Sequence, residues 1–429
     1  MEAMALLFGS MAVFLIIGVP IAFSIGLAIM VTILINGQIP LMVIFQQTYQ
    51  GLDSFTLLAL PLFILAGDLM GRVGIIDDLL TVCEVLLGRV RGSLAHANIL
   101  ASMFFAGISG SATADTAAIG GALIPAMVKQ GYDADFSVGV TASSSVIGPI
   151  IPPSIGFVLY GSTMMVSISA LFMAGVVPGI LLGVALMIPT AYMSHKRNYP
   201  KSNKHYTPIQ IIKTLCRAIP AAIMPVIILG GILSGIFTPT EAADIAVIYA
   251  LLVGFLYYRS LNLKTLCTCI VQSAVSCGPV LLIVGLSYSF GCLVAMTQIP
   301  LAISEFLMEF TSSKYVFLFL VNLFLLAMGC VMESNAILLI CAPVLAPIAT
   351  MFGIDAVHFG VVFVLNIIIG LATPPFGMCM FIATGIAKIP LSKSMKAMIP
   401  FVTAEIIVLF LITYIPELCL TLPRILGLW

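Results

Sequence analysis

Residues 147–157 read IGPIIPPSIGF, and residues 369–378 read IGLATPPFGM. Each stretch interrupts a long apolar run with a glycine that is followed by a proline pair. Proline lacks an amide donor and clashes with the preceding turn, so a helix must unwind at Pro152 and at Pro374. The carbonyl oxygens freed by this unwinding include those of Gly148, Ile151, Gly370 and Thr373. The sequence therefore predicts two broken helices with exposed backbone oxygens.

The rest of the chain is far more apolar than a soluble domain. Of its 429 residues, 61% are hydrophobic and 8% are charged, whereas a soluble domain carries about 25% charged residues. A globule in water could not cover so much apolar surface, so the solvent must be lipid. We predict an all-α integral membrane protein with roughly a dozen transmembrane segments. The first apolar run, from Ala3 to Ile35, predicts an uncleaved membrane helix bent near Pro20.

Charge balance and missing motifs exclude several function classes. The 17 basic and 17 acidic residues give a formal net charge of +0, which offers no basic face to a nucleic acid. The sequence contains no G-x-x-x-x-G-K-[ST] motif, so the chain does not hydrolyse ATP through a P-loop. It also shows no His/Glu metal motif or catalytic dyad within its apolar segments, and we expect it not to be an enzyme.

The two breaks belong to an internal repeat. A shift of 222 residues aligns 107–153 with 329–375 without a gap, and 12 of the 47 positions are identical, where chance would give roughly 4. The rare residues that match are Gly131 with Gly353, Asp133 with Asp355, and Pro152–Pro153 with Pro374–Pro375. The charge pattern suggests that the two halves are inverted. Paired broken segments in two halves indicate a transporter's binding site.

A polar tip precedes each break, at 109–116 (SGSATADT) and at 332–336 (MESNA). The surrounding apolar runs are long enough to enter the membrane and turn back, so we predict two re-entrant hairpins. Each repeat then contributes a hairpin tip and a broken helix. Their carbonyl and hydroxyl oxygens suit Na⁺, and the half-helix N-termini favour a carboxylate substrate.

A basic segment, 195–217, divides the chain into halves of similar length. By the positive-inside rule it is cytoplasmic, and so are Arg89 and Arg91. We predict five parts: scaffold helices with an amphipathic arm (1–92), a first hairpin and broken helix (93–165), a second scaffold half (166–310), a second hairpin and broken helix (311–387), and a C-terminal arm at 388–398 followed by a scaffold helix (388–429).

Long motifs also resemble a known family, the large membrane (M) subunit of TRAP transporters. They are GLDSFTLLALPLFILAGDLM (51–70), SGSATADTAAIGGALIP (109–125), IGPIIPPSI (147–155), GGILSGIFTPTEAADIAVIYALL (230–252) and IGLATPPFG (369–377). The resemblance covers nearly the whole chain. It implies a tripartite, ATP-independent importer of the ion-transporter superfamily, located in the bacterial inner membrane and working by an elevator mechanism.

The same resemblance implies partners, ions and site residues. The partners are a separate small subunit of about four helices and a periplasmic substrate-binding protein, and the substrate is a carboxylate such as a sialic acid, a C4-dicarboxylate or a sugar acid. Two or more Na⁺ ions are implied. The first Na⁺ site would use Ser109, Gly110, Ser111, Gly148, Ile151 and Pro152; the second would use Gly329, Glu333, Gly370, Thr373 and Met378. The substrate would face Ser111, Thr113, Glu333 and Asn335, although the family commonly has aspartate where this chain has Glu333.

Other acidic residues have simpler interpretations. Asp115 could cap the inward helix or shape the ion site, and both remain open. Asp133, Asp355 and the TPTE sequence ending at Glu241 are typical of helix starts. Asp68 and Arg72 are four apart and could pair on one helix face.

Two rival functions remain at this point. A stand-alone Na⁺/carboxylate symporter of the same superfamily would need no binding protein. A channel is less consistent with charge-poor pockets, which suit occluded binding better than a conducting pore.

Overall fold

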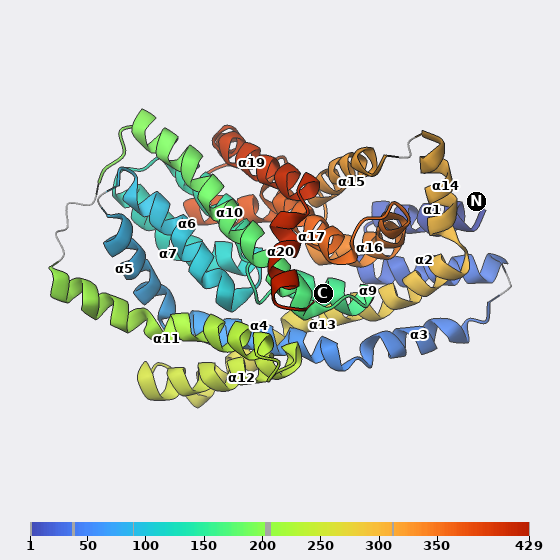
Figure 1. Ribbon diagram of the computed structural model, residues 1–429, viewed down its shortest axis with the longest axis horizontal. Coiled ribbons are helices and arrows are strands. Elements are labelled where there is room, and N and C mark those ends of the chain that lie inside the picture. The colour runs from blue at the N-terminus through green and yellow to red at the C-terminus, as the bar shows by residue number, and fades with distance from the viewer. Residues whose placement is uncertain (1, 37–38, 89, 202–206, 311–312, 429) are drawn as a thin grey trace.

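The computed structural model describes residues 2–36, 39–88, 90–201, 207–310 and 313–428, and all regular elements in these ranges are helices (Figure 1). The first half contains α1 (Glu2–Ile16), α2 (Ile21–Asn36), α3 (Met42–Leu52), η1 (Phe55–Leu58), α4 (Ala59–Arg72), α5 (Ile75–Leu87), α6 (Ser93–Ser109), α7 (Ala112–Lys129), α8 (Ala134–Ser144), η2 (Ser145–Ile147), α9 (Ile155–Met164) and α10 (Ile168–Lys196). The second half contains α11 (Pro208–Leu233), α12 (Pro239–Leu252), η3 (Val253–Tyr257), α13 (Leu263–Met296), α14 (Ile299–Phe310), α15 (Lys314–Gly329), α16 (Ser334–Met351), α17 (Ala356–Ala372), α18 (Met378–Ala387), α19 (Leu391–Tyr414) and α20 (Glu417–Ile425).

The internal repeat extends well beyond the 47 aligned positions. Helices α5 to α10 correspond one by one to α14 to α19: an arm, two hairpin helices, the two pieces of a broken helix, and a long final helix. The second hairpin helix has 18 residues in both halves, and the helix after each break has 10. The inversion of one half relative to the other stays a prediction.

The helices pack in two groups. One group joins α1 to α4 with α11, α12 and α13, and the other joins α6 to α10 with α15 to α20. The predicted division placed 166–310 and 388–429 with the scaffold. In the structure, α10 and α19 pack against each other and against α8 and α17, and the division into scaffold and transport parts stays a prediction.

Three local expectations were wrong. The first apolar run is two helices, α1 and α2, which pack side by side because the chain reverses at Gly18, where φ is +91°. The predicted arm at 388–398 is no separate element, since α19 runs unbroken from Leu391 to Tyr414. The predicted basic loop 195–217 is shorter, because α10 continues to Lys196 and α11 begins at Pro208. Residues 202–206 of that loop, and Arg89, lie outside the described residues.

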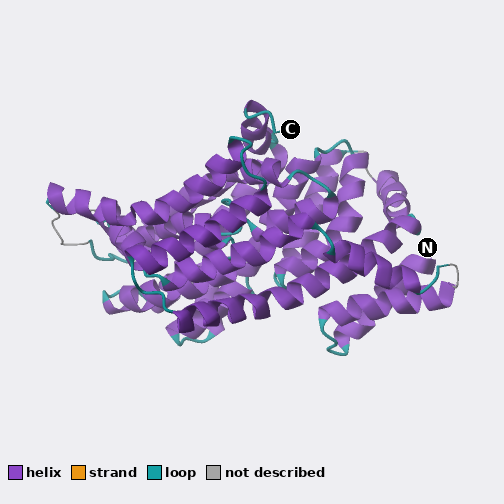
Figure 2. Ribbon diagram, turned by 90° about the horizontal axis from the view of Figure 1, so that it is seen from below, coloured by secondary structure: helices purple, strands orange, loops and turns teal. Residues whose placement is uncertain are grey.

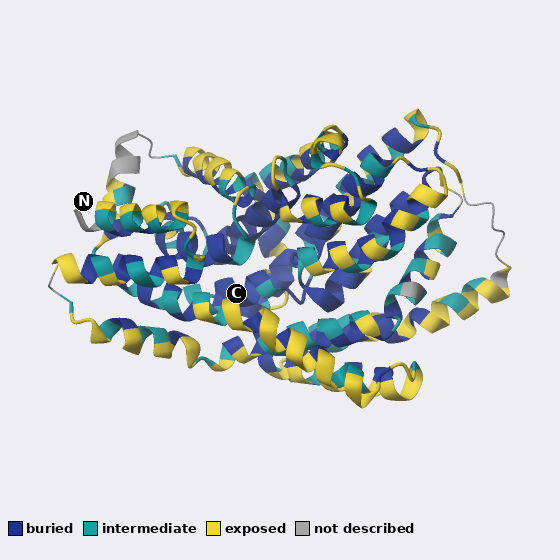
Figure 3. Ribbon diagram, turned by 180° about the vertical axis from the view of Figure 1, so that it is seen from behind, coloured by how far each residue is buried: buried dark blue, intermediate teal, exposed yellow. Residues whose placement is uncertain are grey.

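The exterior of the molecule matches a lipid solvent. Among the described residues, seven helices are long and apolar enough to cross a membrane alone, and shorter apolar helices of 10–17 residues include α6, α9, α15, α17 and α18. Large apolar side chains such as Val226 and Val275 are about 70% exposed. The helical body is elongated (Figure 2), and buried residues gather in its middle (Figure 3). An apolar surface of this kind is stable only against hydrocarbon.

Two of the predicted helix starts form as expected, and one differs. Thr238 accepts a hydrogen bond from Glu241 N while Glu241 Oε2 accepts one from Thr238 N, which completes a capping box. Asp355 Oδ1 accepts from the amides of Val357 and His358. Asp133 occupies the equivalent position in the first repeat, but its side chain makes no cap.

The side chain of Asp133 is held by the start of the basic loop instead. Its Oδ2 accepts hydrogen bonds from Arg197 Nη1 at 2.8 Å and from the Tyr199 hydroxyl at 2.7 Å. Arg197 Nη1 also contacts Asp135 Oδ1 at 3.1 Å. This cluster ties the connection between α7 and α8 to the end of α10.

Candidate functional site

The tip of the first hairpin consists of Gly110 and Ser111, between α6 and α7. Gly110 has a φ of +62°, and a Cβ at this position would lie 2.6 Å from the carbonyl oxygen of Pro153. Only glycine can make this turn against the first break. Ser111 is the N-cap of α7, and its hydroxyl lies 3.2 Å from that of Thr113.

Asp115 lies one turn further along α7, and its side chain is fully buried. Its Oδ1 accepts a hydrogen bond from the Ser109 hydroxyl. Its Oδ2 has no hydrogen-bond partner among the described residues. A Cβ on Gly148 would collide with this Oδ2 and lie 3.0 Å from Asp115 Cγ. One carboxylate oxygen of the hairpin therefore faces the start of the first break.

The first break spans residues 148–154, between η2 and α9. Because Pro152 has no amide hydrogen, it cannot donate to the carbonyl of Gly148. Within the part of the chain that the structure describes, no donor reaches the carbonyl oxygen of Gly148 or that of Ile151. The carbonyl of Pro149 is satisfied by the Ser154 hydroxyl at 2.5 Å, and Ser154 also caps α9. Two backbone oxygens remain available here.

The second repeat has the same parts with different bonding. Glu333 is the N-cap of α16, and its Oε2 accepts from Ala336 N at 3.1 Å. In the second break, Gly370 O accepts from Thr373 N at 3.0 Å, and Thr373 O accepts from Gly377 N at 3.3 Å. The Thr373 hydroxyl donates to Ile369 O at 2.8 Å. The backbone oxygens of this break are therefore partly satisfied within the chain. The proline pairs of both breaks are joined by cis peptide bonds.

The second hairpin touches its broken helix directly. A Cβ on Gly329 would lie 2.9 Å from the Cα of Gly370, and one on Gly370 would lie 3.0 Å from Gly329 O. The two backbones are in contact, so both positions require glycine. This contact fixes the end of α15 against α17.

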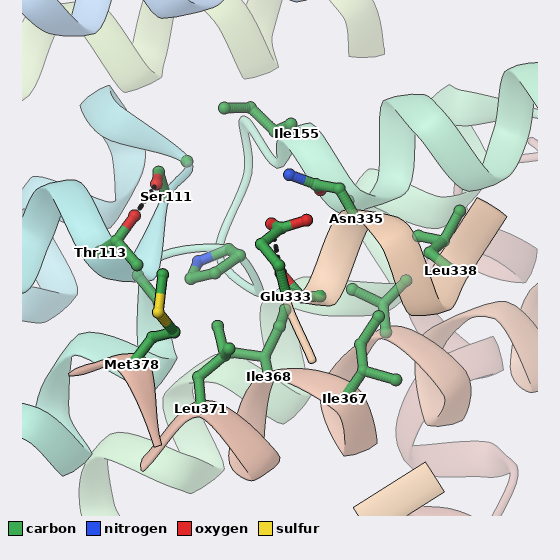
Figure 4. A pocket seen from close by; sticks show the side chains of 16 residues that line it. Ser111, Thr113, Ile155, Glu333, Asn335, Leu338, Ile367, Ile368, Leu371 and Met378 are labelled. Carbon is green, nitrogen blue, oxygen red and sulfur yellow. Dashed lines mark hydrogen bonds between the residues drawn. The ribbon is translucent and has the colours of Figure 1, made fainter. Parts of the chain in front are cut away.

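The two hairpin tips meet at one pocket, which has a cavity volume of about 70 Å³. The four residues predicted to face the substrate all line it: Ser111, Thr113, Glu333 and Asn335. Figure 4 shows the two hydroxyls of the first tip facing the Glu333 carboxylate and the Asn335 amide across the space. Gly110 and Met378 also line the pocket, whereas Ser109 lines a neighbouring cavity.

The other predicted ion-site residues do not line either cavity among the described residues. Gly148, Ile151, Pro152, Gly329, Gly370 and Thr373 are absent from the described lining of both cavities. They lie at the breaks and at the α15–α17 contact. The predicted substrate and ion positions therefore overlap in part, since Ser111 and Glu333 belong to both sets and line the pocket.

Sequence reasoning missed the apolar part of the pocket. Ile155, Leu338, Ile367, Ile368 and Leu371 line it beside the polar groups. These residues look like any other apolar position in a membrane helix, so no local signal marks them. They give the pocket apolar surface suited to the carbon skeleton of a ligand (Figure 4).

A second, larger cavity adjoins the first, and the two share Ser111, Thr113, Ile155 and Asn335 in their linings. On its far side it is bounded by α4 and α13, through residues that include Asp68, Arg72 and Ser276. Asp68 and Arg72 do not pair as expected: Ser273 donates to Asp68 Oδ2 at 2.6 Å, and Arg72 donates to Gln272.

Comparison with known proteins places these features in a wider context. Residues 8–418 match the family model described as tripartite ATP-independent periplasmic transporter, DctM component. The chain is 38% identical to the sialic acid TRAP transporter large permease protein SiaM of Vibrio cholerae, covering 95% of each chain. It is also 38% identical to the isethionate TRAP transporter permease protein DctMQ of Oleidesulfovibrio alaskensis, covering 97% of this chain and 66% of that relative.

The fold also has solved counterparts. The YdaH transporter of Alcanivorax borkumensis superposes with a TM-score of 0.60 at 15% sequence identity, covering 86% of this chain and 87% of that one. At this identity the likeness concerns the fold alone.

Proposed function

Since this chain belongs to the DctM component family of tripartite ATP-independent periplasmic transporters, we propose that it imports an organic carboxylate across the bacterial inner membrane, driven by Na⁺. The observation that carries this proposal is the pocket between the two hairpin tips, which brings together Ser111 and Thr113 from one repeat and Glu333 and Asn335 from the other. A pocket at the interface of two repeats is typical of secondary transporters.

The polar groups of the pocket suit an acid that also carries hydroxyls. The hydroxyls of Ser111 and Thr113 and the side-chain amide of Asn335 can donate hydrogen bonds to a carboxylate. The Glu333 carboxylate can only accept, so it would pair with substrate hydroxyl or amide hydrogens. The apolar wall would pack against the carbon skeleton. This combination favours a sialic acid or a sugar acid, and a C4-dicarboxylate is the alternative within the same class.

The residues of the first repeat fit a Na⁺ ion. Hard cations take oxygen ligands, and a fully buried Asp115 oxygen without a donor lies beside the break that leaves the carbonyls of Gly148 and Ile151 unbonded. A buried carboxylate oxygen without a donor is costly, and a cation beside it would offset this cost. Ser109 orients the carboxylate through the other oxygen. Bound Na⁺ would supply positive charge near the substrate carboxylate.

The second repeat offers a different set of oxygens. Gly370 and Thr373 each accept one backbone hydrogen bond, and a carbonyl oxygen retains a second lone pair for a cation. One carboxylate oxygen of Glu333 accepts a hydrogen bond from the backbone amide of Ala336 at the start of α16. We propose a second Na⁺ here, completed by local rearrangement of the break.

We also propose an elevator mechanism, in which the helix group that carries both hairpins moves against the other group. Helices α4 and α13, which belong to the group without the hairpins, line the larger cavity, so they would form the fixed wall past which the pocket moves. The glycine contacts at Gly110 and Gly329 would keep each hairpin attached to its broken helix during this motion.

The proposed partners are a small membrane subunit of about four helices and a periplasmic substrate-binding protein. The isethionate relative, of which this chain covers 66%, is named DctMQ, and its further third would correspond to the small subunit. Here we propose that this subunit is a separate chain.

Uptake into proteoliposomes tests the proposal. The chain, co-purified with its small subunit, is assayed with radiolabelled N-acetylneuraminate, succinate or gluconate, with Na⁺ or with K⁺ or choline outside, and with or without binding protein. We expect uptake of one of these acids only with Na⁺ and binding protein together. Full uptake in K⁺ would contradict Na⁺ coupling, and full uptake without binding protein would indicate the stand-alone symporter.

A further inference from the structure

The larger cavity adjoins the hairpin pocket, shares lining residues with it and extends to the end of α4. Its lining runs from Ser111 and Thr113 at the first hairpin tip to Asp68 and Arg72 on α4. Helix α4 ends at Arg72, and the arm α5 begins at Ile75. Because α5 leads towards Arg91 and the basic loop, the positive-inside rule assigns this end of the cavity to the cytoplasm.

Arg72 is unusually free to meet an anion. Its guanidinium donates to the side chain of Gln272, a neutral acceptor, and its side chain is exposed. No carboxylate of the described residues lies within 4.0 Å of it. The nearest acid in sequence on its own helix face, Asp68, is held by Ser273 on α13. Two consecutive α13 residues thus keep the acid and the base of α4 apart.

Charge along the cavity makes this arginine significant. Of the described residues that line the two joined cavities, Glu333 and Asp68 are acidic and Arg72 is the one cation. A carboxylate leaving the pocket towards α4 meets negative potential at both acids. An arginine offers a planar pair of donors that matches a carboxylate, and it raises the local anion concentration.

We propose that Arg72 is a docking residue for the substrate carboxylate on the cytoplasmic side, occupied as substrate leaves the hairpin pocket. This inference rests on the proposed function, because it requires an anionic substrate. Gln272 positions the guanidinium without neutralising it, and Ser273 prevents Asp68 from competing for it. Arg72 therefore acts on binding from the cytoplasmic side and leaves the hairpin pocket unchanged.

The test is substrate exchange across proteoliposomes that contain the chain with its small subunit. Wild type is first assayed for uptake of N-acetylneuraminate, succinate and gluconate, and the acid transported fastest becomes the probe. The substrate concentration that gives half-maximal exchange is then measured with substrate added at the cytoplasmic face of the protein and, separately, at the periplasmic face. The variants are Arg72→Gln, Arg72→Lys and a matched control, Arg217→Gln, which removes an exposed charge on α11 away from both cavities.

We expect Arg72→Gln to raise the cytoplasmic half-saturation concentration about tenfold, as the loss of one charge-assisted contact implies. The periplasmic value should stay within twofold, and so should both values for Arg217→Gln. Arg72→Lys should recover part of the loss, because the charge remains. Equal shifts on both sides, or no cytoplasmic shift in Arg72→Gln, would overturn the proposal. Absence of uptake of any acid by wild type would instead contradict the proposed function.

Discussion

The buried carboxylate of Asp115 lies against the backbone of Gly148, so close that a Cβ on this glycine would be 3.0 Å from Asp115 Cγ. The hairpin and the broken helix of the first repeat meet at this contact. One oxygen of Asp115 is held by Ser109, and the other lacks a partner among the described residues. The contact therefore couples the geometry of a candidate ion ligand to the position of the break.

Gly148→Ala should damage transport through this contact. The new methyl group must displace Asp115 Oδ2, and overpacking of this kind costs about 1–3 kcal/mol. We expect a higher Na⁺ concentration for half-maximal uptake and a lower melting temperature in detergent. The control is Gly121→Ala on α7, where a Cβ has nothing within 4 Å. A Gly148→Ala protein that transports like Gly121→Ala would show that the contact has no role.

Alanine substitutions should distinguish the pocket residues from the Asp133 cluster outside the pocket. Ser111→Ala and Glu333→Ala remove groups that line the pocket, and a hydrogen bond to a charged group is worth about 1.5–3 kcal/mol. We expect uptake efficiency to fall about tenfold or more for each. Asp133→Ala, outside the pocket, should retain most of the uptake. Equal losses in all three variants would refute the residue assignments while leaving the fold intact.

Thr238→Ala should lower stability without changing the substrate. Thr238 and Glu241 form a reciprocal capping box at the start of α12, where the threonine hydroxyl and the glutamate carboxylate each accept a backbone amide. Loss of such a cap costs about 1 kcal/mol. Thermal unfolding of the purified protein measures this cost, and the half-saturation constant for uptake should not change. An altered substrate preference would instead place α12 in the transport pathway.

The Asp133 cluster should make a small, pH-dependent contribution to stability. Hydrogen bonds from Tyr199 and Arg197 hold the pKa of Asp133 below its ordinary value of 3.8. A lowered pKa means that the folded state prefers the carboxylate, so the contribution is present above about pH 4 and is lost as the pH falls through the folded-state pKa. Arg197 and Asp133 are 31% and 56% exposed, which limits the effect to below about 1 kcal/mol.

Melting temperatures of wild type and Asp133→Asn, measured from pH 6 to about pH 3, check this expectation. The wild-type advantage should be largest at pH 6 and should shrink at the acid end. An advantage that grows on acidification would mean that the pKa is raised rather than lowered.

Much of the candidate site could be predicted from the sequence because its signals are local. A proline pair removes amide donors wherever the chain places it, so the breaks near Pro152 and Pro374 follow from covalent chemistry. Glycine and hydroxyl residues between apolar runs mark a tip such as Gly110–Ser111 for a similar reason. The 222-residue repeat then identifies the second hairpin from the first.

Helix boundaries and the hydrogen-bond partners of side chains were harder to predict, because they depend on contacts between distant segments. Asp133 and Asp355 are aligned in the repeat, yet only Asp355 caps its helix, since Arg197 and Tyr199 bind the other. Similarly, the i, i+4 spacing of Asp68 and Arg72 suggested a pair that α13 separates. Neither outcome has a signal in the local sequence.

The amino-acid sequence by itself determined that this protein is a helical membrane protein, that it contains two related halves, and where each half is interrupted. These properties follow from hydrophobicity, from proline and glycine chemistry and from internal similarity, all of which act along the chain. Only the tertiary structure decided that the two tips share one pocket, that an oxygen of Asp115 faces the first break, and that Arg72 lines the adjoining cavity. Those relationships arise from packing between segments far apart in sequence, where the shape of each neighbour selects which oxygens and charges stay unpaired.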